Sequence, residues 1–199
     1  MPEETDVTSQ RNGKGLTDRQ QAEVDSEWFP DADGILRRDA ARVVLFDPAG
    51  RIFLIRGHDV GDLEHSWWFT VGGGLAPGES LRAGACRELA EETGLELDPE
   101  RLAGPALARH ATFHFALEKR RQDEVFFFAH VSGDEARGIG KGRHLTALEE
   151  DLLDEMRWWD PHEIPSAEEH STFYPLGIAE LALSWWRGWD GTCPEVWEE

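Results

Sequence analysis

Three glutamates recur on one side of a predicted helix, Glu88, Glu91 and Glu92. At about 100° per residue, their side chains fall within an arc of roughly 100° and form one acidic stripe. Carboxylates that close repel one another and raise each other's pKa, so a positive partner best explains the stripe. A hard divalent cation, Mg²⁺ or Mn²⁺, takes such oxygen ligands together with substrate phosphate and water. The stripe therefore predicts a cation site suited to phosphate chemistry.

Local signals bound the helix that must carry this stripe. Ser80 is the expected N-cap, and Gly94 stands just past the expected last turn. A glycine turn at residues 72–74 precedes the helix and offers free backbone groups near the acids. Taken alone, the stripe would be an ordinary solvated helix face, so the surrounding residues decide the interpretation.

The spacing of these residues resembles the Nudix box, GX5EX7REUXEEXGU with U apolar. Gly73, Glu79 and residues 87–95 match it at every fixed position. The resemblance implies the Nudix fold, a mixed β-sheet sandwiched between α-helices, which is an α+β class. The order of predicted strands and helices along the chain is itself mixed and agrees with this class.

The resemblance also implies roles for the acids. Glu91 and Glu92 are expected to bind the cation together with the Gly72 carbonyl. Glu88 is either a further metal ligand or the base that deprotonates the attacking water. The implied reaction is substitution by water at a phosphorus of a diphosphate bridge, which depends on positioning and charge neutralisation.

Two further groups are expected to support this chemistry. Arg87 can pair with Glu91 one turn later and reach back to Glu79, which would hold the loop against the helix. Nudix enzymes often use an acid outside the motif, and Glu124 is the first candidate here, with Glu118 second. The competing interpretation of both is an ordinary surface residue at the end of a hairpin.

Candidate substrate contacts lie before the motif. Trp67 and Trp68 are predicted to offer a stacking platform for a nucleotide base, although aromatic residues more often belong to the core. Arg56 follows a predicted strand, where it could contact a phosphate or nucleoside.

Composition restricts the partners. The net charge of -20 argues against a nucleic acid polymer and leaves a small nucleoside diphosphate derivative, bridged by metal, as the expected partner. Two cysteines make no disulfide framework, and neither a signal peptide nor a membrane span is visible, so a cytoplasmic protein is expected.

Three parts are expected along the chain. Residues 1–37 read as a polar N-terminal extension, disordered up to about residue 21 and then an aromatic arm that docks on the domain or on a second subunit. Residues 38–190 are the expected Nudix domain, and residues 191–199 an acidic C-terminal tail. The arm makes a homodimer a reasonable expectation.

Within the domain, the patterns predict seven features. They are a hairpin of residues 40–46 and 51–56, a loop at 57–66, a short strand at 67–71, a hairpin of 110–115 and 124–131 with its tip at 119–123, a mobile loop at 132–142, a last strand at 156–159 and a helix at 174–186.

The predicted function is a divalent-metal-dependent hydrolase that cleaves the diphosphate linkage of a nucleoside diphosphate joined to another group. The alternative is a Nudix-fold domain that binds or senses a nucleotide metabolite without turnover. The motif does not specify which group is attached to the diphosphate.

Overall fold

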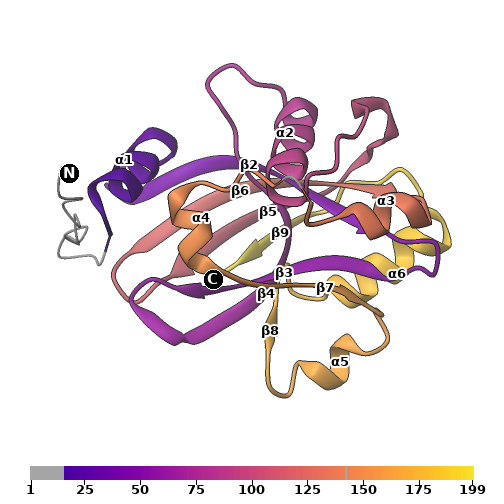
Figure 1. Ribbon diagram of the computed structural model, residues 1–199. Coiled ribbons are helices and arrows are strands. Elements are labelled where there is room, and N and C mark those ends of the chain that lie inside the picture. Colours follow the sequence, from indigo (N-terminus) through magenta and orange to yellow (C-terminus); the bar gives the residue numbers. More distant parts are fainter. Residues whose placement is uncertain (1–15, 142) are drawn as a thin grey trace, which may run out of the picture.

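A computed structural model describes residues 16–141 and 143–199. In this part of the chain a nine-stranded mixed sheet carries helices on both faces (Figure 1). The helices are α1 (Asp18–Glu27), α2 (Leu81–Thr93), α3 (Gly133–Gly138), α4 (Ala147–Leu152), α5 (Ile164–Ala167) and α6 (Ile178–Gly188), with a 3-10 turn, η1, at Pro99–Arg101. The strands are β1 (Phe29–Pro30), β2 (Leu36–Phe46), β3 (Ile52–Asp59), β4 (Asp62–Gly74), β5 (Ala103–His114), β6 (Lys119–His130), β7 (Leu153–Trp159), β8 (Thr172–Phe173) and β9 (Glu195–Glu198).

The main strand order is β7-β3-β4-β2-β6-β5-β9. Strand β2 pairs with β6 in parallel along its whole length and with β4 antiparallel. A single pair, Phe46 with Ile52, joins β2 to β3. The predicted hairpin of residues 40–46 and 51–56 is therefore wrong beyond its turn, because β3 pairs with β4 and β7 instead.

The predicted loop at residues 57–66 is also wrong. Strand β3 continues to Asp59 and β4 begins at Asp62, so most of this segment is a β-hairpin. Its tip is tied to the neighbouring hairpin, because the Asp59 carboxylate accepts hydrogen bonds from the N–H groups of Gly61 (3.0 Å) and Ala116 (2.7 Å). The exposed polar residues at the start of β4 concealed the strand from a periodicity argument.

The predicted hairpin of residues 110–115 and 124–131 is confirmed as β5 and β6, although both strands are longer than expected. Residues 119–123, predicted as the tip, belong to β6 and pair with β5. Glu124 consequently lies inside β6 rather than at its opening.

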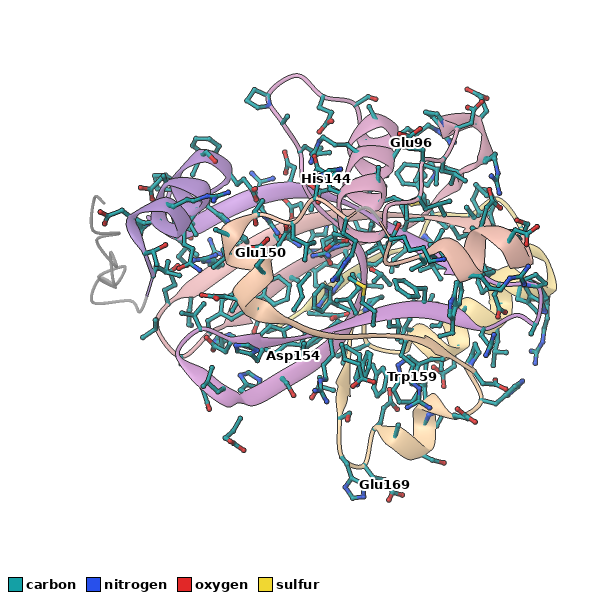
Figure 2. The ribbon with its side chains drawn as sticks, viewed as in Figure 1. Glu96, His144, Glu150, Asp154, Trp159 and Glu169 are labelled. Carbon is teal, nitrogen blue, oxygen red and sulfur yellow. The ribbon has the colours of Figure 1, made fainter. Side chains whose placement is uncertain are left out.

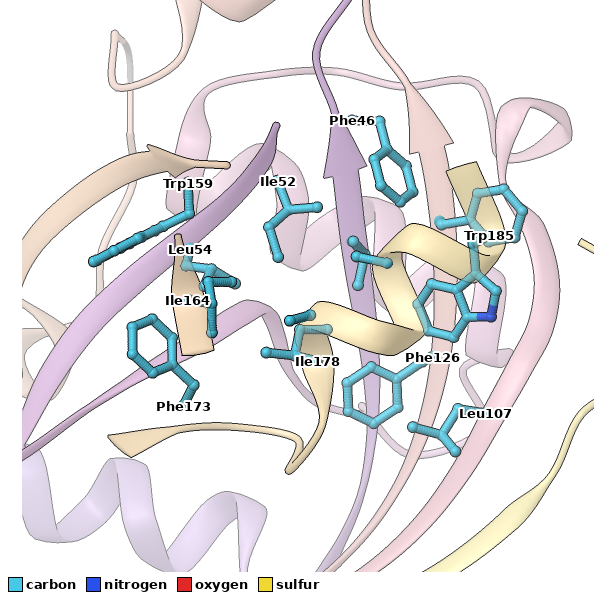
Figure 3. Packing of buried hydrophobic residues seen from close by; sticks show 14 of the residues in the cluster. Phe46, Ile52, Leu54, Leu107, Phe126, Trp159, Ile164, Phe173, Ile178 and Trp185 are labelled. Atoms are coloured by element: carbon cyan, nitrogen blue, oxygen red, sulfur yellow. The ribbon is translucent and has the colours of Figure 1, made fainter. Parts of the chain in front are cut away.

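Alternation along the central strands divides the apolar side chains between two layers. Val44 and Phe46 of β2 face α6, whose Ile178 and Trp185 complete that cluster (Figure 3). On the opposite face, the layer around α2 holds the residues whose burial fixes that helix on the sheet: Val43, Leu45, Ala85, Leu89 and Phe127. The predicted helix at 174–186 corresponds to α6, which begins four residues later, after Gly177 in the left-handed conformation (φ 73°).

The N-terminal part of the chain docks on the domain. Of the predicted extension, residues 1–15 lie outside the described residues. Disorder at residues 18–21 is wrong, because they open α1 behind a capping box of Thr17 and Gln20. Strand β1 then pairs with β2.

Three further predictions need correction. The predicted tail at 191–199 contains β9, which pairs with β5 in parallel. The predicted loop at 132–142 contains α3, capped by Ser132 and Glu135. The strand predicted at 156–159 is β7, but it is not the last strand, because β8 and β9 follow it.

Among the described residues, no helix combines the length and the apolar character that crossing a bilayer requires.

Candidate active site

The acidic helix has the boundaries that the sequence predicts. The Ser80 hydroxyl oxygen accepts a hydrogen bond from the Ala83 N–H (3.3 Å), and Gly94 ends α2 in the left-handed region at φ 75°. The apolar side of α2 packs onto the sheet through Ala85 and Leu89, which turns the acidic side toward the end of β4.

The three glutamates of the stripe have unequal environments. Glu88 and Glu92 are buried, with 6% and 3% of their surface exposed, whereas the Glu91 side chain is 40% exposed. The Gly72 N–H donates to Glu92 Oε2 at 2.7 Å. A Cβ at Gly73 would lie only 2.5 Å from Glu88 Oε2, so glycine at this position makes room for that carboxylate. The glycine stretch and the two buried acids therefore form one contact surface.

Arg87 holds this surface together. It forms a bidentate pair with Glu79, with Nε to Oε1 at 3.0 Å and Nη2 to Oε2 at 2.9 Å. Its Nη1 donates to Glu88 (2.7 Å) and to Glu91 (3.0 Å), and its Nη2 donates to the Gly74 carbonyl (2.8 Å). The hydrogen bond from Arg87 lowers the pKa of Glu79. The loop before α2 is thereby fixed to the helix, in the arrangement expected of an orienting residue.

Arg87 does not fully offset the effect of burial on the pKa values of Glu88 and Glu92. Burial raises the pKa of Glu88 to about 7, against the opposing effect of Arg87. Burial and the neighbouring charges of Glu88 and Glu149 raise the pKa of Glu92 well above its usual value. A divalent cation such as Mg²⁺ or Mn²⁺ takes hard oxygen donors and would favour the charged form of both acids.

The predicted ligand set is nevertheless not preassembled. Within residues 16–141 and 143–199, no three His, Cys, Asp or Glu side chains are already gathered as a metal centre. Glu91 is turned toward Arg87, and the Gly72 carbonyl accepts a hydrogen bond from Arg42 Nη1 (2.5 Å). Cation binding would have to exchange these contacts.

A cavity of about 240 Å³ runs from the acidic helix along the inner face of the sheet. Glu88 and Glu92 line one end of it, and charged residues of β2, β5 and β6 form its floor. The aromatic residues that line it are Trp28, Trp67, Phe69, Phe113, Phe115, Phe126 and Tyr174. An apolar chamber with a few convergent polar groups suits a small organic ligand.

Glu124, the first candidate for a further acid, lies in the floor of this cavity. It is 2% exposed and accepts hydrogen bonds from Arg42 Nε (2.8 Å) and Arg109 Nη1 (2.5 Å). Burial opposes the effect of these two arginines, which nevertheless lower the pKa of Glu124. A carboxylate held in this way is a weak base. Glu118, the second candidate, lines the cavity and pairs with Arg120.

Only one of the three predicted substrate residues lines the cavity. Trp67 does. Trp68 is buried in the opposite layer against Trp159 and Phe173, so a stacking role for it is wrong. Arg56 lies outside the cavity with its guanidinium directed toward Asp154 and Glu155 on the edge strand β7, where Figure 2 labels Asp154. The tryptophans separate because neighbouring residues of a strand face opposite sides of the sheet.

Sequence reasoning missed Glu149 of α4. It lines the cavity, and its charge contributes to raising the pKa of both Glu88 and Glu92. The chain before α4 is tied to α2, because the His144 N–H donates to the Glu91 carbonyl at 2.8 Å. The capping box of Thr146 and Glu149 was the available signal, since it marks a helix start.

The comparisons with known proteins identify the family and the fold. The family model described as "NUDIX domain" matches residues 36–177. An RNA pyrophosphohydrolase of Caulobacter vibrioides is 31% identical over 161 residues, spanning 73% of this chain and 83% of that protein. An RNA pyrophosphohydrolase of Erythrobacter litoralis is 26% identical over 151 residues, spanning 68% of this chain and 83% of its relative.

Two solved structures share the fold. The MutT protein from Methanosarcina mazei has a TM-score of 0.51 at 20% identity, covering 76% of this chain and 94% of that one. A NUDIX hydrolase from Nitrosomonas europaea has a TM-score of 0.51 at 18% identity, with 76% and 88% covered. The fold is thus the predicted α+β Nudix fold.

A capped acidic helix on a mixed sheet, with its arginine clamp and glycine contacts, defines the Nudix class of domain. The chain belongs to the Nudix family, and the predicted enzyme class, a Nudix-type pyrophosphohydrolase, is confirmed at that level.

Proposed function

We propose that this protein is a divalent-cation-dependent hydrolase that cleaves the diphosphate linkage of a nucleoside diphosphate derivative. The observation that carries the proposal is the pair of buried acids, Glu88 and Glu92, in contact with Gly72 and Gly73 at one end of an aromatic-lined cavity. The buried acids would meet the diphosphate, and the aromatic walls would enclose the group attached to it.

Glu88, Glu91 and Glu92 are the side chains proposed to hold Mg²⁺ or Mn²⁺, with the Gly72 carbonyl as a further ligand once Arg42 releases it. The bound cation would neutralise phosphate charge and lower the pKa of water. Arg87 and Glu79 position the acids, and Glu88 or Glu149 accepts the proton of the attacking water. Glu149 is supported over Glu124 for this second choice, because two arginines hold Glu124.

The test is a panel of nucleotide-linked diphosphates incubated with Mg²⁺ or Mn²⁺, with the products identified by mass. We expect hydrolysis by the native protein and a loss of about 100-fold or more in Glu92→Gln, since it removes a charged ligand of the cation that neutralises the reacting phosphate. Glu96→Gln is the matched control, because Glu96 is exposed just beyond the same helix (Figure 2). Full activity of Glu92→Gln would contradict the proposal.

A second substrate class is the phosphorylated 5′ end of RNA. The names of the relatives from Caulobacter vibrioides and Erythrobacter litoralis support this class. An RNA substrate would differ from the expectation that no nucleic acid polymer is bound. A 5′-triphosphorylated oligonucleotide therefore belongs in the panel.

The non-hydrolytic alternative, a nucleotide-metabolite sensor, predicts binding by calorimetry without product after prolonged incubation with either cation. A cytoplasmic location and a homodimer stay predictions of the sequence.

A further inference from the structure

Arg38 of β2 lies where a diphosphate at the acidic helix would extend. It lines the cavity and rests on the end of β4, since a Cβ at Gly74 would lie 3.3 Å from its Nη1. Although burial raises the pKa of the adjacent Glu88, the Arg38 guanidinium opposes that rise. The Nε of Arg38 donates to Gln122 Oε1 at 2.5 Å, and its guanidinium lies over the Trp28 ring, 4.3 Å from the ring centroid, so two contacts fix its orientation. Arg38 is therefore a preoriented cation one residue beyond the glycine that receives Glu88.

The carboxylate that meets this guanidinium comes from outside the Nudix match. Glu27 is the last residue of α1, whereas the family match starts at residue 36. Its Oε2 accepts a hydrogen bond from Arg38 Nη1 and would lie 3.1 Å from a Cβ at Gly74. A carboxylate and a phosphate offer a guanidinium the same pair of anionic oxygens. One oxygen of the Glu27 carboxylate thus takes a guanidinium N–H that an anionic phosphate oxygen would also accept.

Helix stability does not explain an acid at this place. The C-terminal end of a helix carries partial negative charge, which disfavours an acid at the position of Glu27. The last turn of α1 contains no basic residue that would compensate. The Glu27 side chain is 41% exposed, so it can leave Arg38 for water without a large desolvation change.

The rest of the N-terminal arm fixes Glu27 over the cavity. Val24 and Trp28 line the cavity and pack with Leu148 of α4. The Gln20 side chain donates to the Ala147 carbonyl (3.1 Å) and to Asp151 (2.8 Å) on α4. Figure 1 shows α1 and α4 together at the same end of the sheet. With the arm in place the cavity of about 240 Å³ falls below the roughly 300–1,000 Å³ of typical ligand sites.

We propose that Arg38 is a phosphate-binding residue of this site, and that the Glu27 carboxylate occupies it until the phosphate of a nucleoside diphosphate ligand displaces it. The inference rests on the proposed function for the place of the diphosphate. It adds a residue, and a competing group from the N-terminal arm, that the Nudix motif does not contain. Substrate binding therefore breaks the Glu27–Arg38 pair and forms an Arg38–phosphate pair.

The experiment is calorimetric binding of α,β-methylene-ADP, whose diphosphate bridge resists hydrolysis, to the full chain with Mg²⁺. We expect Glu27→Gln to bind about twofold to fivefold more tightly, because the competing ion pair, whose Glu27 partner is 41% exposed, is removed. Arg38→Gln is expected to bind about tenfold or more weakly, because a charged hydrogen bond to phosphate is lost.

Gln20→Ala is the matched control for loosening of the arm, because it cuts the attachment of α1 to α4 and leaves the Glu27 charge in place. Because the packing of Val24 and Trp28 against Leu148 still holds the arm, this variant should tighten binding by less than Glu27→Gln does. The proposal is overturned if Glu27→Gln binds no more tightly than the native protein, or if Gln20→Ala tightens binding as much. The readout is binding, so it is independent of turnover. If the variants bind the analogue as expected but the native protein hydrolyses nothing in the panel, only the proposed function is refuted.

Discussion

Replacing Glu124 with glutamine should destabilise the protein strongly. The change keeps the shape of the side chain but removes the single charge that Arg42 and Arg109 share in the cavity floor. The Arg42 and Arg109 side chains are only 10% and 3% exposed, so water cannot replace the partner that Arg42 loses, whereas Arg109 keeps its ion pair with Glu198 (2.6 Å). Breaking a buried ion pair from one side costs about 3–5 kcal/mol. Because the glutamine oxygen still accepts one hydrogen bond, the lower end, about 3 kcal/mol, is expected.

Thermal unfolding measures this cost. For a protein of this size 1 kcal/mol corresponds to about 2–4 °C in Tm, so Glu124→Gln should unfold about 6–12 °C lower than the native protein. Asp134→Asn is the control, because Asp134 and Arg137 form an ion pair at the surface and its loss should cost at most about 1 kcal/mol. A Tm within 2 °C of the native value, combined with a large loss of turnover, would refute this reasoning and make Glu124 the base instead.

The remaining predictions concern pH, the glycines and the tryptophans. The pKa of Glu124 is lowered in the folded state, so its contribution to stability is present above the ordinary glutamate pKa near 4.5 and is lost as pH falls further. The difference in unfolding free energy between the native protein and Glu124→Gln should therefore shrink below about pH 4.5, and a difference that stays constant as pH falls would contradict this. Gly73→Ala should keep the fold but weaken cation binding in calorimetry, since the new Cβ would meet the side-chain carboxylate of Glu88 rather than backbone. Gly72→Ala should unfold the protein, since its Cβ would lie 2.1 Å from the Ala41 carbonyl oxygen. Trp68→Ala should cost about 3–5 kcal/mol in urea unfolding as a core residue, whereas Trp67→Ala should change KM with little change in stability; equal destabilisation by both would contradict this assignment.

The features predicted correctly are those that depend on residues close together in the sequence. The N-cap at Ser80, the left-handed Gly94 and the contacts of Arg87 with Glu79 and Glu91 lie within one stretch of chain, so spacing alone specifies them. The β5–β6 hairpin belongs to the same kind, because its strands are neighbours in sequence.

The errors arise where the partner of a segment is distant in sequence. Strand β2 looked like half of a hairpin with β3, but its register partner is β6, more than 80 residues later, which no local pattern indicates. The same separation concealed the floor of the cavity. Arg42 and Glu124 meet only because parallel pairing places β2 beside β6. Trp67 and Trp68 could not be distinguished until the face of β4 was known.

Net charge also misleads about the cavity. The chain carries a net charge of -20, yet Arg38, Arg42, Arg109 and Arg120 all line the cavity, each facing a glutamate. An anionic group can therefore enter by replacing carboxylates, while a longer nucleic acid would also meet the acidic exterior. Salt separates these effects, because it screens exposed charges more than buried ones.

We compare the KM of a 5′-triphosphorylated RNA of about 20 nucleotides with the KM of a triphosphorylated dinucleotide. We expect the ratio of the first KM to the second to fall as NaCl rises from about 50 to about 300 mM, because salt shortens the Debye length and screens repulsion of the longer RNA. The dinucleotide cancels effects inside the cavity, so the ratio reports repulsion outside it. Proteins that bind nucleic acid through basic surfaces show the opposite dependence. A ratio that rises with salt would mean that a basic surface receives the polymer, and the charge argument against nucleic acid would have to be given up.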